Sequence, residues 1–137
     1  MASILAVDDS EAIRTLMKVV LENAGHTVFL KENGREALDF ARDHTVDLVI
    51  TDLNMPEMGG MSLVGNLRRL DNYKTKPILV MTTETADYKK QKAKTVGATG
   101  WIAKPVDKDR LLQAVNPKNK ATSKIRGFLT LIFFFIN

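Results

Sequence analysis

Short apolar runs alternate with helix-like segments through the first 116 residues of the chain. The runs predict five strands, and their continuous apolar character is typical of strands buried on both faces of a parallel sheet. The segments between and after them carry apolar residues at helical spacing. We therefore expect an α/β fold: a doubly wound, five-stranded parallel sheet with five helices. For its strands we take the order 2-1-3-4-5, one of the two common orders of such sheets. The predicted strands are residues 3–9 (ending in two acids), 26–32, 46–51, 76–82 and 100–104, and the predicted helices are residues 13–24, 33–44, 63–70, 85–98 and 107–115.

The composition narrows the class of protein. An apolar content of 45% and a charged content of 26% are ordinary for one globular domain with its own core. The absence of cysteine excludes disulfides and thiolate metal sites or nucleophiles. The first residues, MASILAVDDSE, lack the basic lead of a secretory signal, so we expect a cytoplasmic protein.

The C-terminal segment, residues 117–137, differs from the rest of the chain. It holds four of the 20 basic residues and no acid, which leaves 16 basic against 16 acidic side chains in residues 1–116. The net charge of +4 therefore reflects this segment and does not predict nucleic-acid binding. Its apolar end, GFLTLIFFFIN, is well short of the roughly 20 residues that span a membrane. Its composition is compatible with packing on the domain, joining another chain, touching a membrane surface or arising by readthrough, and does not select among them.

Polar side chains follow four of the five predicted strands. Because the carboxyl ends of parallel strands meet at one edge of a sheet, we expect these side chains to converge there. The second strand is outermost in the predicted order and contributes only Lys31 and Glu32. Three carboxylates, a hydroxyl and an ammonium are thus expected on one rim. The residues that follow the other strands are Asp8, Asp9 and Ser10, then Asp52 and Asn54, then Thr82, Thr83 and Glu84, and finally Lys104.

The chemistry of this set predicts a phosphoryl site. Three crowded carboxylates repel one another unless a cation neutralises them. Hard oxygen ligands without histidine or cysteine suit Mg²⁺. A metal ion and a lysine would neutralise phosphoryl oxygens, a threonine would donate a hydrogen bond, and a carboxylate could form an aspartyl phosphate as nucleophile.

Each of these residues also has an ordinary structural interpretation. Asp9 or Ser10 could cap the first helix, and Asp52 could form a turn. Thr82 is a common residue at a strand end, and Lys104 could be a solvated lysine. Each ordinary interpretation is favoured when a residue is taken alone. Together they require four independent coincidences on one edge, which favours a shared site.

These residues resemble the receiver domains of two-component response regulators, most closely the single-domain CheY type with its flavodoxin-like fold. The paired acids after the first strand match, as do the TTE and KP motifs after the fourth and fifth strands. The loop DLNMPEMGG, residues 52–60, fits the pattern Asp-x-x-Met-Pro-x-Met-x-Gly. The resemblance covers residues 1–116, and leaves 117–137 as a tail of unassigned role.

The resemblance implies a role for each acid. Asp52 would accept a phosphoryl group from the phosphohistidine of a histidine kinase. Mg²⁺ would be bound by Asp52, directly by Asp9, through water by Asp8, and by the backbone carbonyl of Asn54. Asn54 and Glu84 would tune the lifetime of the acyl phosphate.

The resemblance also implies a switch. Thr82 and Lys104 would hold the phosphoryl oxygens, and the Lys104–Pro105 bond would be cis. An inward movement of Thr82 would make room for Trp101, which stands where the family usually has tyrosine or phenylalanine; plain core packing is the alternative role for this indole. The lysine-rich segment 88–94 and the fifth strand beside it would form the docking face for a downstream protein.

The leading functional prediction is a monomeric signalling switch that is activated by phosphorylation, with chemotaxis or motility as its candidate pathway. Its only chemistry would be self-catalysed phosphoryl transfer and autodephosphorylation. Its output is expected through protein docking, without nucleic acid or a membrane span. Two alternatives stay open. One is a phosphate-independent interaction module. The other is a small aspartyl-phosphate phosphatase, which is disfavoured because that class needs an acid where this chain has Asn54.

Overall fold

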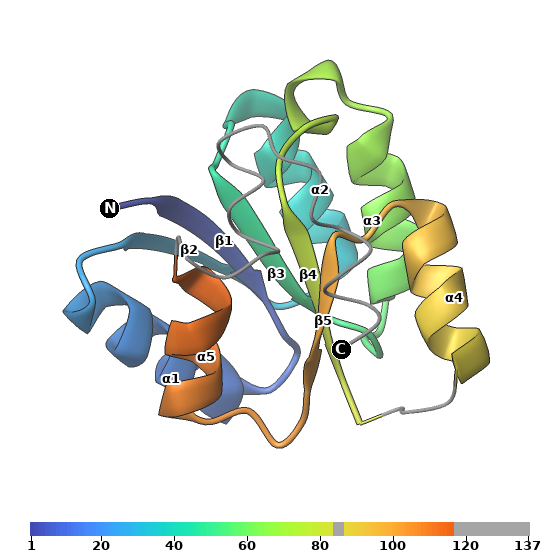
Figure 1. Ribbon diagram of the computed structural model, residues 1–137. Coiled ribbons are helices and arrows are strands. Elements are labelled where there is room, and N and C mark those ends of the chain that lie inside the picture. Colours follow the sequence, from blue (N-terminus) through green and yellow to red (C-terminus); the bar gives the residue numbers. More distant parts are fainter. Residues whose placement is uncertain (84–86, 117–137) are drawn as a thin grey trace.

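The computed structural model describes residues 1–83 and 87–116. Within them lies one sheet of five parallel strands in the order β2-β1-β3-β4-β5, which confirms the predicted fold class and strand order (Figure 1). The strands are β1 (Ser3–Val7), β2 (Thr27–Lys31), β3 (Leu48–Asp52), β4 (Ile78–Thr82) and β5 (Gly100–Ala103). The helices are α1 (Glu11–Asn23), α2 (Gly34–Asp43), α3 (Gly60–Arg68), the 3₁₀ turn η1 (Asp71–Tyr73), α4 (Asp87–Val96) and α5 (Lys108–Val115).

Helices cover both faces of the sheet. α1 and α5 pack on one face, and α2, α3 and α4 pack on the other (Figure 1). Successive strand residues point to opposite faces, so Ile4 and Ala6 enter the core under α1 and α5, whereas Leu5 and Val7 enter the other core. This two-sided burial explains why the strands read as continuous apolar runs in the sequence.

Local capping sets several helix boundaries. The Ser10 hydroxyl accepts a hydrogen bond from the Ile13 amide at 3.3 Å and caps α1, as the side chains of Asn33 and Asp107 do for α2 and α5. Gly25, where the sequence predicted the end of the first helix, has a φ of 97°, a conformation that favours glycine. The Ser10 and Asp107 caps therefore begin helices directly after β1 and β5, whose carboxyl ends share one edge of the parallel sheet.

The third predicted helix differs most from the structure, whereas the ends of the other predicted elements differ by at most two residues. The helix expected at residues 63–70 begins at Gly60 and ends at Arg68, and Leu70 leads into η1. The fully buried Tyr73 explains this break, because its hydroxyl accepts a hydrogen bond from the Val46 amide and donates one to the His44 carbonyl. The chain must therefore leave the helix axis to bring the ring into the core.

Two sequence predictions lie outside the described residues. These are the role of Glu84 and the character of the tail at residues 117–137. In the part of the chain that the structure describes, no helix combines the length and apolar character needed to cross a membrane.

Candidate functional site

Three carboxylates meet at the carboxyl end of the sheet. Asp8 follows β1, Asp9 is the next residue, and Asp52 is the last residue of β3. One carboxylate oxygen from each lies within 4.8 Å of the others. Asp8 and Asp52 are buried and Asp9 is exposed, so the cluster opens to solvent on the side of Asp9. Strand register brings these acids together, since β1 and β3 are paired neighbours.

Lys104 connects two of these acids. Its Nζ lies 2.9 Å from Asp52 Oδ1 and 3.5 Å from Asp8 Oδ2. The Lys104 amide donates to the Thr82 carbonyl at 2.9 Å, and the cis Lys104–Pro105 peptide bond agrees with the expectation from the sequence. Burial disfavours the charged ammonium, but the hydrogen bond with Asp52 and the charges of Asp8 and Asp52 outweigh it and raise the pKa of Lys104. The ammonium is thus held charged between two carboxylates.

Asp8 is the most constrained of the acids. Its amide donates to the Lys31 carbonyl at 3.2 Å, and its Oδ1 accepts from the Ser10 amide at 2.8 Å. Its buried Oδ2 has no hydrogen-bond partner. Burial is the main cause that raises the pKa of the Asp8 carboxyl; the Ser10 amide opposes this shift, the Asp52 charge adds to it, and Lys104 opposes it.

This arrangement fits a hard divalent cation. Three carboxylate donors lie close together, and one buried oxygen among them lacks a hydrogen bond. Mg²⁺ prefers such oxygen ligands and typically keeps several waters, which the exposed side at Asp9 would accommodate. The donor set is therefore suited to Mg²⁺.

The raised pKa of Asp8 predicts that its charge destabilises the metal-free fold. A carboxyl whose folded pKa lies above the unfolded value binds more protons when folded, so stability falls as the pH rises from about the ordinary value of 3.8 through the folded pKa. We expect Asp8→Asn to increase the free energy of unfolding at pH 7 in EDTA by about 1 kcal/mol. Urea unfolding of both proteins at pH 7 and pH 4 measures this gain, which should shrink at pH 4. A variant less stable than the parent at pH 7 would contradict it.

Thr82 and Trp101 lie on the same face of the sheet. The register pairs Val80 with Trp101 and Thr82 with Ala103, and Val80 and Trp101 both pack on the core under α2, α3 and α4. Because alternate strand residues share a face, Thr82 also faces that side. Thr82 is buried, Trp101 is half-buried, and Lys90 Nζ lies 5.5 Å from the indole centroid.

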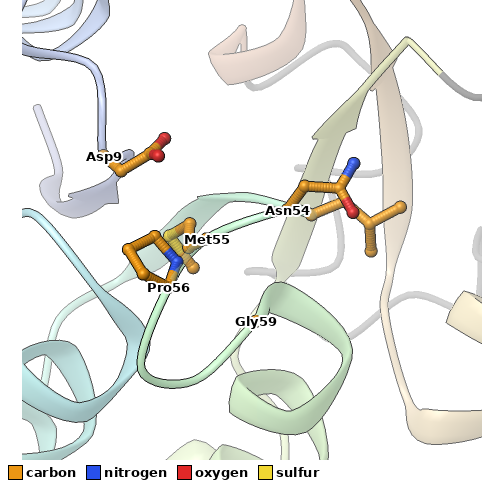
Figure 2. Close-up of a pocket in the computed structure, with 6 residues that line it drawn as sticks. Asp9, Asn54, Met55, Pro56 and Gly59 are labelled. Atoms are coloured by element: carbon orange, nitrogen blue, oxygen red, sulfur yellow. The ribbon is translucent and has the colours of Figure 1, made fainter.

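The loop after β3 borders a hollow of about 390 Å³. Asp9 faces the Met55–Pro56 turn across this hollow, and Asn54 and Gly59 complete its labelled rim (Figure 2). Asn54 is exposed here, on the same hollow that Asp9 lines. The hollow gives a solvent path to the acids from the side of Asp9.

Two residues at the site, Gly60 and Arg14, had no role predicted from the sequence. Gly60 lies close against the end of β3, since its amide donates to the Leu53 carbonyl at 2.8 Å and a Cβ there would lie 2.4 Å from the Asp52 carbonyl oxygen. Arg14 on α1 donates through Nη1 to the Asp8 carbonyl at 2.8 Å. Gly60 belongs to the loop motif at residues 52–60, but the motif does not show why glycine is needed there. The only sequence signal for Arg14 is its position, less than two helical turns after Asp8 and Asp9.

Comparisons with known proteins agree with this geometry. Residues 4–116 match the family described as the response regulator receiver domain. The chain is 34% identical to Protein PilH of Pseudomonas aeruginosa over 116 residues, 85% of this chain and 96% of that protein. It is 38% identical to a Chemotaxis protein CheY homolog of Campylobacter jejuni over 104 residues, 74% of this chain and 80% of that protein. The solved structure of the chemotaxis response regulator CheY4 of Vibrio cholerae is similar, with a TM-score of 0.81 and 46% identity over 84% of this chain and 96% of that one.

Proposed function

Because the chain belongs to the response regulator receiver domain family and is CheY-like, we propose that it is a phosphorylation-activated switch that accepts a phosphoryl group on Asp52 from a histidine kinase. Receiver domains are signalling switches of two-component systems rather than conventional enzymes. The observation that carries the proposal is the ion pair of Lys104 with Asp52 inside a cluster of three carboxylates. That cluster stands at the edge of the sheet where ligands of such folds bind.

The proposed reaction uses the Asp52 carboxylate as nucleophile. A bond forms between its oxygen and the phosphorus of the phosphohistidine, the P–N bond breaks, and the imidazole nitrogen keeps the electron pair. Lys104 would move its charge from the carboxylate to a phosphoryl oxygen, and Thr82 would donate a hydrogen bond to another. Both residues begin close to Asp52, since Thr82 ends the strand paired with β3 and Lys104 Nζ is 2.9 Å from Asp52.

Receiver domains generally bind Mg²⁺ at an acidic pocket, and the corresponding group here is Asp8, Asp9 and Asp52. We assign the metal to these carboxylates and to the backbone carbonyl of Asn54. When bound, the ion neutralises charge on the phosphoryl oxygens and on the carboxylates. Autodephosphorylation by water would reverse the modification, with Asn54 at the rim of the hollow and Glu84 as the residues that tune its rate.

The proposed output is a change on the face formed by α4 and β5. Thr82 and Trp101 share one side of the sheet, so a hydrogen bond that draws Thr82 toward the phosphate would leave room for the indole. An element with two alternative positions needs only a small difference in free energy to move from one position to the other. Around it stand the exposed Tyr88 and the lysines of α4, which suit an acidic partner segment.

We place this switch in the cytoplasm as a monomer, where a kinase and a protein target are both accessible. Its similarity to a Chemotaxis protein CheY homolog and to the chemotaxis response regulator CheY4 favours chemotaxis, or motility more broadly, as its pathway. The region 1–116 would act as the receiver, and the tail would not be needed for phosphoryl acceptance.

The experiment that tests this function supplies phosphoramidate, a small P–N donor, with Mg²⁺. Intact mass and Trp101 fluorescence are recorded together, with Asp52→Asn as the control. We expect a mass gain of one phosphoryl group that is lost in the control and in EDTA, and a fluorescence change with the same time course. A mass gain without a fluorescence change would overturn the Trp101 switch. No mass gain from phosphoramidate or from a panel of phosphorylated kinases would favour a phosphate-independent module.

A further inference from the structure

Arg14 contacts the acid cluster through the backbone. It lies near the start of α1, and its side chain is only 18% exposed. Its Nη1 donates to the Asp8 carbonyl at 2.8 Å, and its Nη2 lies 3.9 Å from Glu32 Oε2 in the loop after β2. The guanidinium therefore spans the ends of two neighbouring strands.

The Asp8 carbonyl belongs to the peptide unit that leads into Asp9. Asp9 is exposed, and its carboxylate makes no hydrogen bond or ion pair within residues 1–83 and 87–116. Its direction is therefore set by its backbone rather than by side-chain partners. On one side, the Asp8 carboxylate bonds to the Ser10 amide at 2.8 Å, and on the other, Arg14 fixes the Asp8 carbonyl.

We propose that Arg14 is a positioning residue for the metal site, which holds the Asp8–Asp9 peptide so that the Asp9 carboxylate is preorganised toward Asp8 and Asp52. Preorganised ligands bind metal more tightly because less ordering remains to be done on binding, and residues behind the ligands tune affinity in this way. The inference rests on the proposed function only in taking Mg²⁺ as the ion.

The contact with Glu32 is not the source of this effect. Glu32 has a side chain that is 58% exposed, and 3.9 Å is a long separation for an ion pair. Such exposed pairs contribute little. The short hydrogen bond to the carbonyl, by contrast, comes from a charged donor and is partly buried.

The test is calorimetric titration of Mg²⁺ into the unphosphorylated full chain. Arg14→Met keeps the apolar stem of the side chain and removes its donors. We expect the Kd for Mg²⁺ to rise about tenfold, the lower end for residues that orient metal ligands. Arg14→Lys restores one hydrogen-bond donor, so its Kd for Mg²⁺ should lie between those of the parent and Arg14→Met. Glu32→Gln should bind Mg²⁺ with the same Kd as the parent chain.

A second control separates position from charge. Lys18, one turn further along α1, pairs with Glu22 rather than with the acid turn, so Lys18→Met removes the same charge from the helix without touching the site. An equal loss of affinity in Lys18→Met and Arg14→Met would overturn the inference, as would a parent-like Kd in a folded Arg14→Met whose only change is a lowered Tm.

Phosphoryl acceptance gives a further readout. The Mg²⁺ concentration at half-maximal rate should rise in Arg14→Met while the rate at saturating Mg²⁺ stays near that of the parent. The calorimetric result does not depend on phosphoryl acceptance. Weakened Mg²⁺ binding in a chain that never takes phosphate would therefore overturn the proposed function and keep this inference, whereas a parent chain that fails to bind Mg²⁺ would overturn the inference.

Discussion

Replacing Lys104 with methionine is expected to slow phosphoryl acceptance by Asp52 about a hundredfold or more, the usual effect of removing a group that stabilises developing charge. Lys104 Nζ lies 2.9 Å from Asp52 Oδ1, so it is placed to follow the negative charge onto the phosphoryl oxygens. The rate is measured by intact mass with phosphoramidate at saturating Mg²⁺. Lys108→Met, at an exposed position on α5, is the matched control and should react like the parent.

The same variant should also be less stable without metal. Methionine would leave the buried Asp8 and Asp52 facing each other without the ammonium. Removing one partner of a buried ion pair commonly costs about 3 kcal/mol, and part of this loss should be recovered at pH 4, where the Asp8 carboxyl, whose pKa is raised mainly by burial, takes up a proton. Urea unfolding in EDTA at pH 7 and pH 4 measures both values. A variant as fast and as stable as the parent would show that Lys104 is a solvated lysine.

Replacing Gly60 with alanine is the second large effect we expect. A Cβ at this position would lie 2.4 Å from the Asp52 carbonyl oxygen and 2.8 Å from Leu53 Cα. Both are backbone atoms at the end of β3, which carries Asp52, so they cannot rotate away as a side chain could. We expect a loss of about 3 kcal/mol in the free energy of unfolding, together with slower phosphoryl acceptance because Asp52 must shift.

Gly65 provides the matched control in the same helix, because a Cβ there meets nothing within 4 Å. Gly65→Ala should stabilise the protein by about 0.5–1 kcal/mol, the gain typical of replacing a glycine inside a helix. Thermal unfolding and the phosphoramidate assay compare the two variants. Equal stability of Gly60→Ala and Gly65→Ala would contradict the close approach of α3 to the end of β3.

The sequence was sufficient to predict the fold because both its signals are local. Continuous apolar runs identified the strands, and apolar residues at helical spacing identified the helices, with Gly25 marking the end of the first. The break between Arg68 and η1 was not predictable, since it depends on where the Tyr73 ring fits among residues distant in the sequence.

The candidate site was predictable in its residues but not in its electrostatics. Strand ends placed Asp8, Asp52 and Lys104 on one edge, and the structure brings them within ion-pair distance. The lack of a hydrogen bond at Asp8 Oδ2 depends on burial and angles that no motif records. Arg14 was missed for a related reason, because it acts through a backbone carbonyl and so leaves no pattern of paired charges in the sequence.

The central claim is that Asp52, rather than Asp8 or Asp9, carries the phosphoryl group. The three carboxylates lie within 4.8 Å of one another, so a mass gain alone does not distinguish them. Borohydride reduces an acyl phosphate to an alcohol and converts the modified aspartate to homoserine, which peptide mass spectrometry then locates. The account predicts homoserine at position 52 after treatment with phosphoramidate and Mg²⁺. Homoserine at position 8 or 9, or an unchanged Asp52 in a sample that carries the phosphoryl mass, would contradict it.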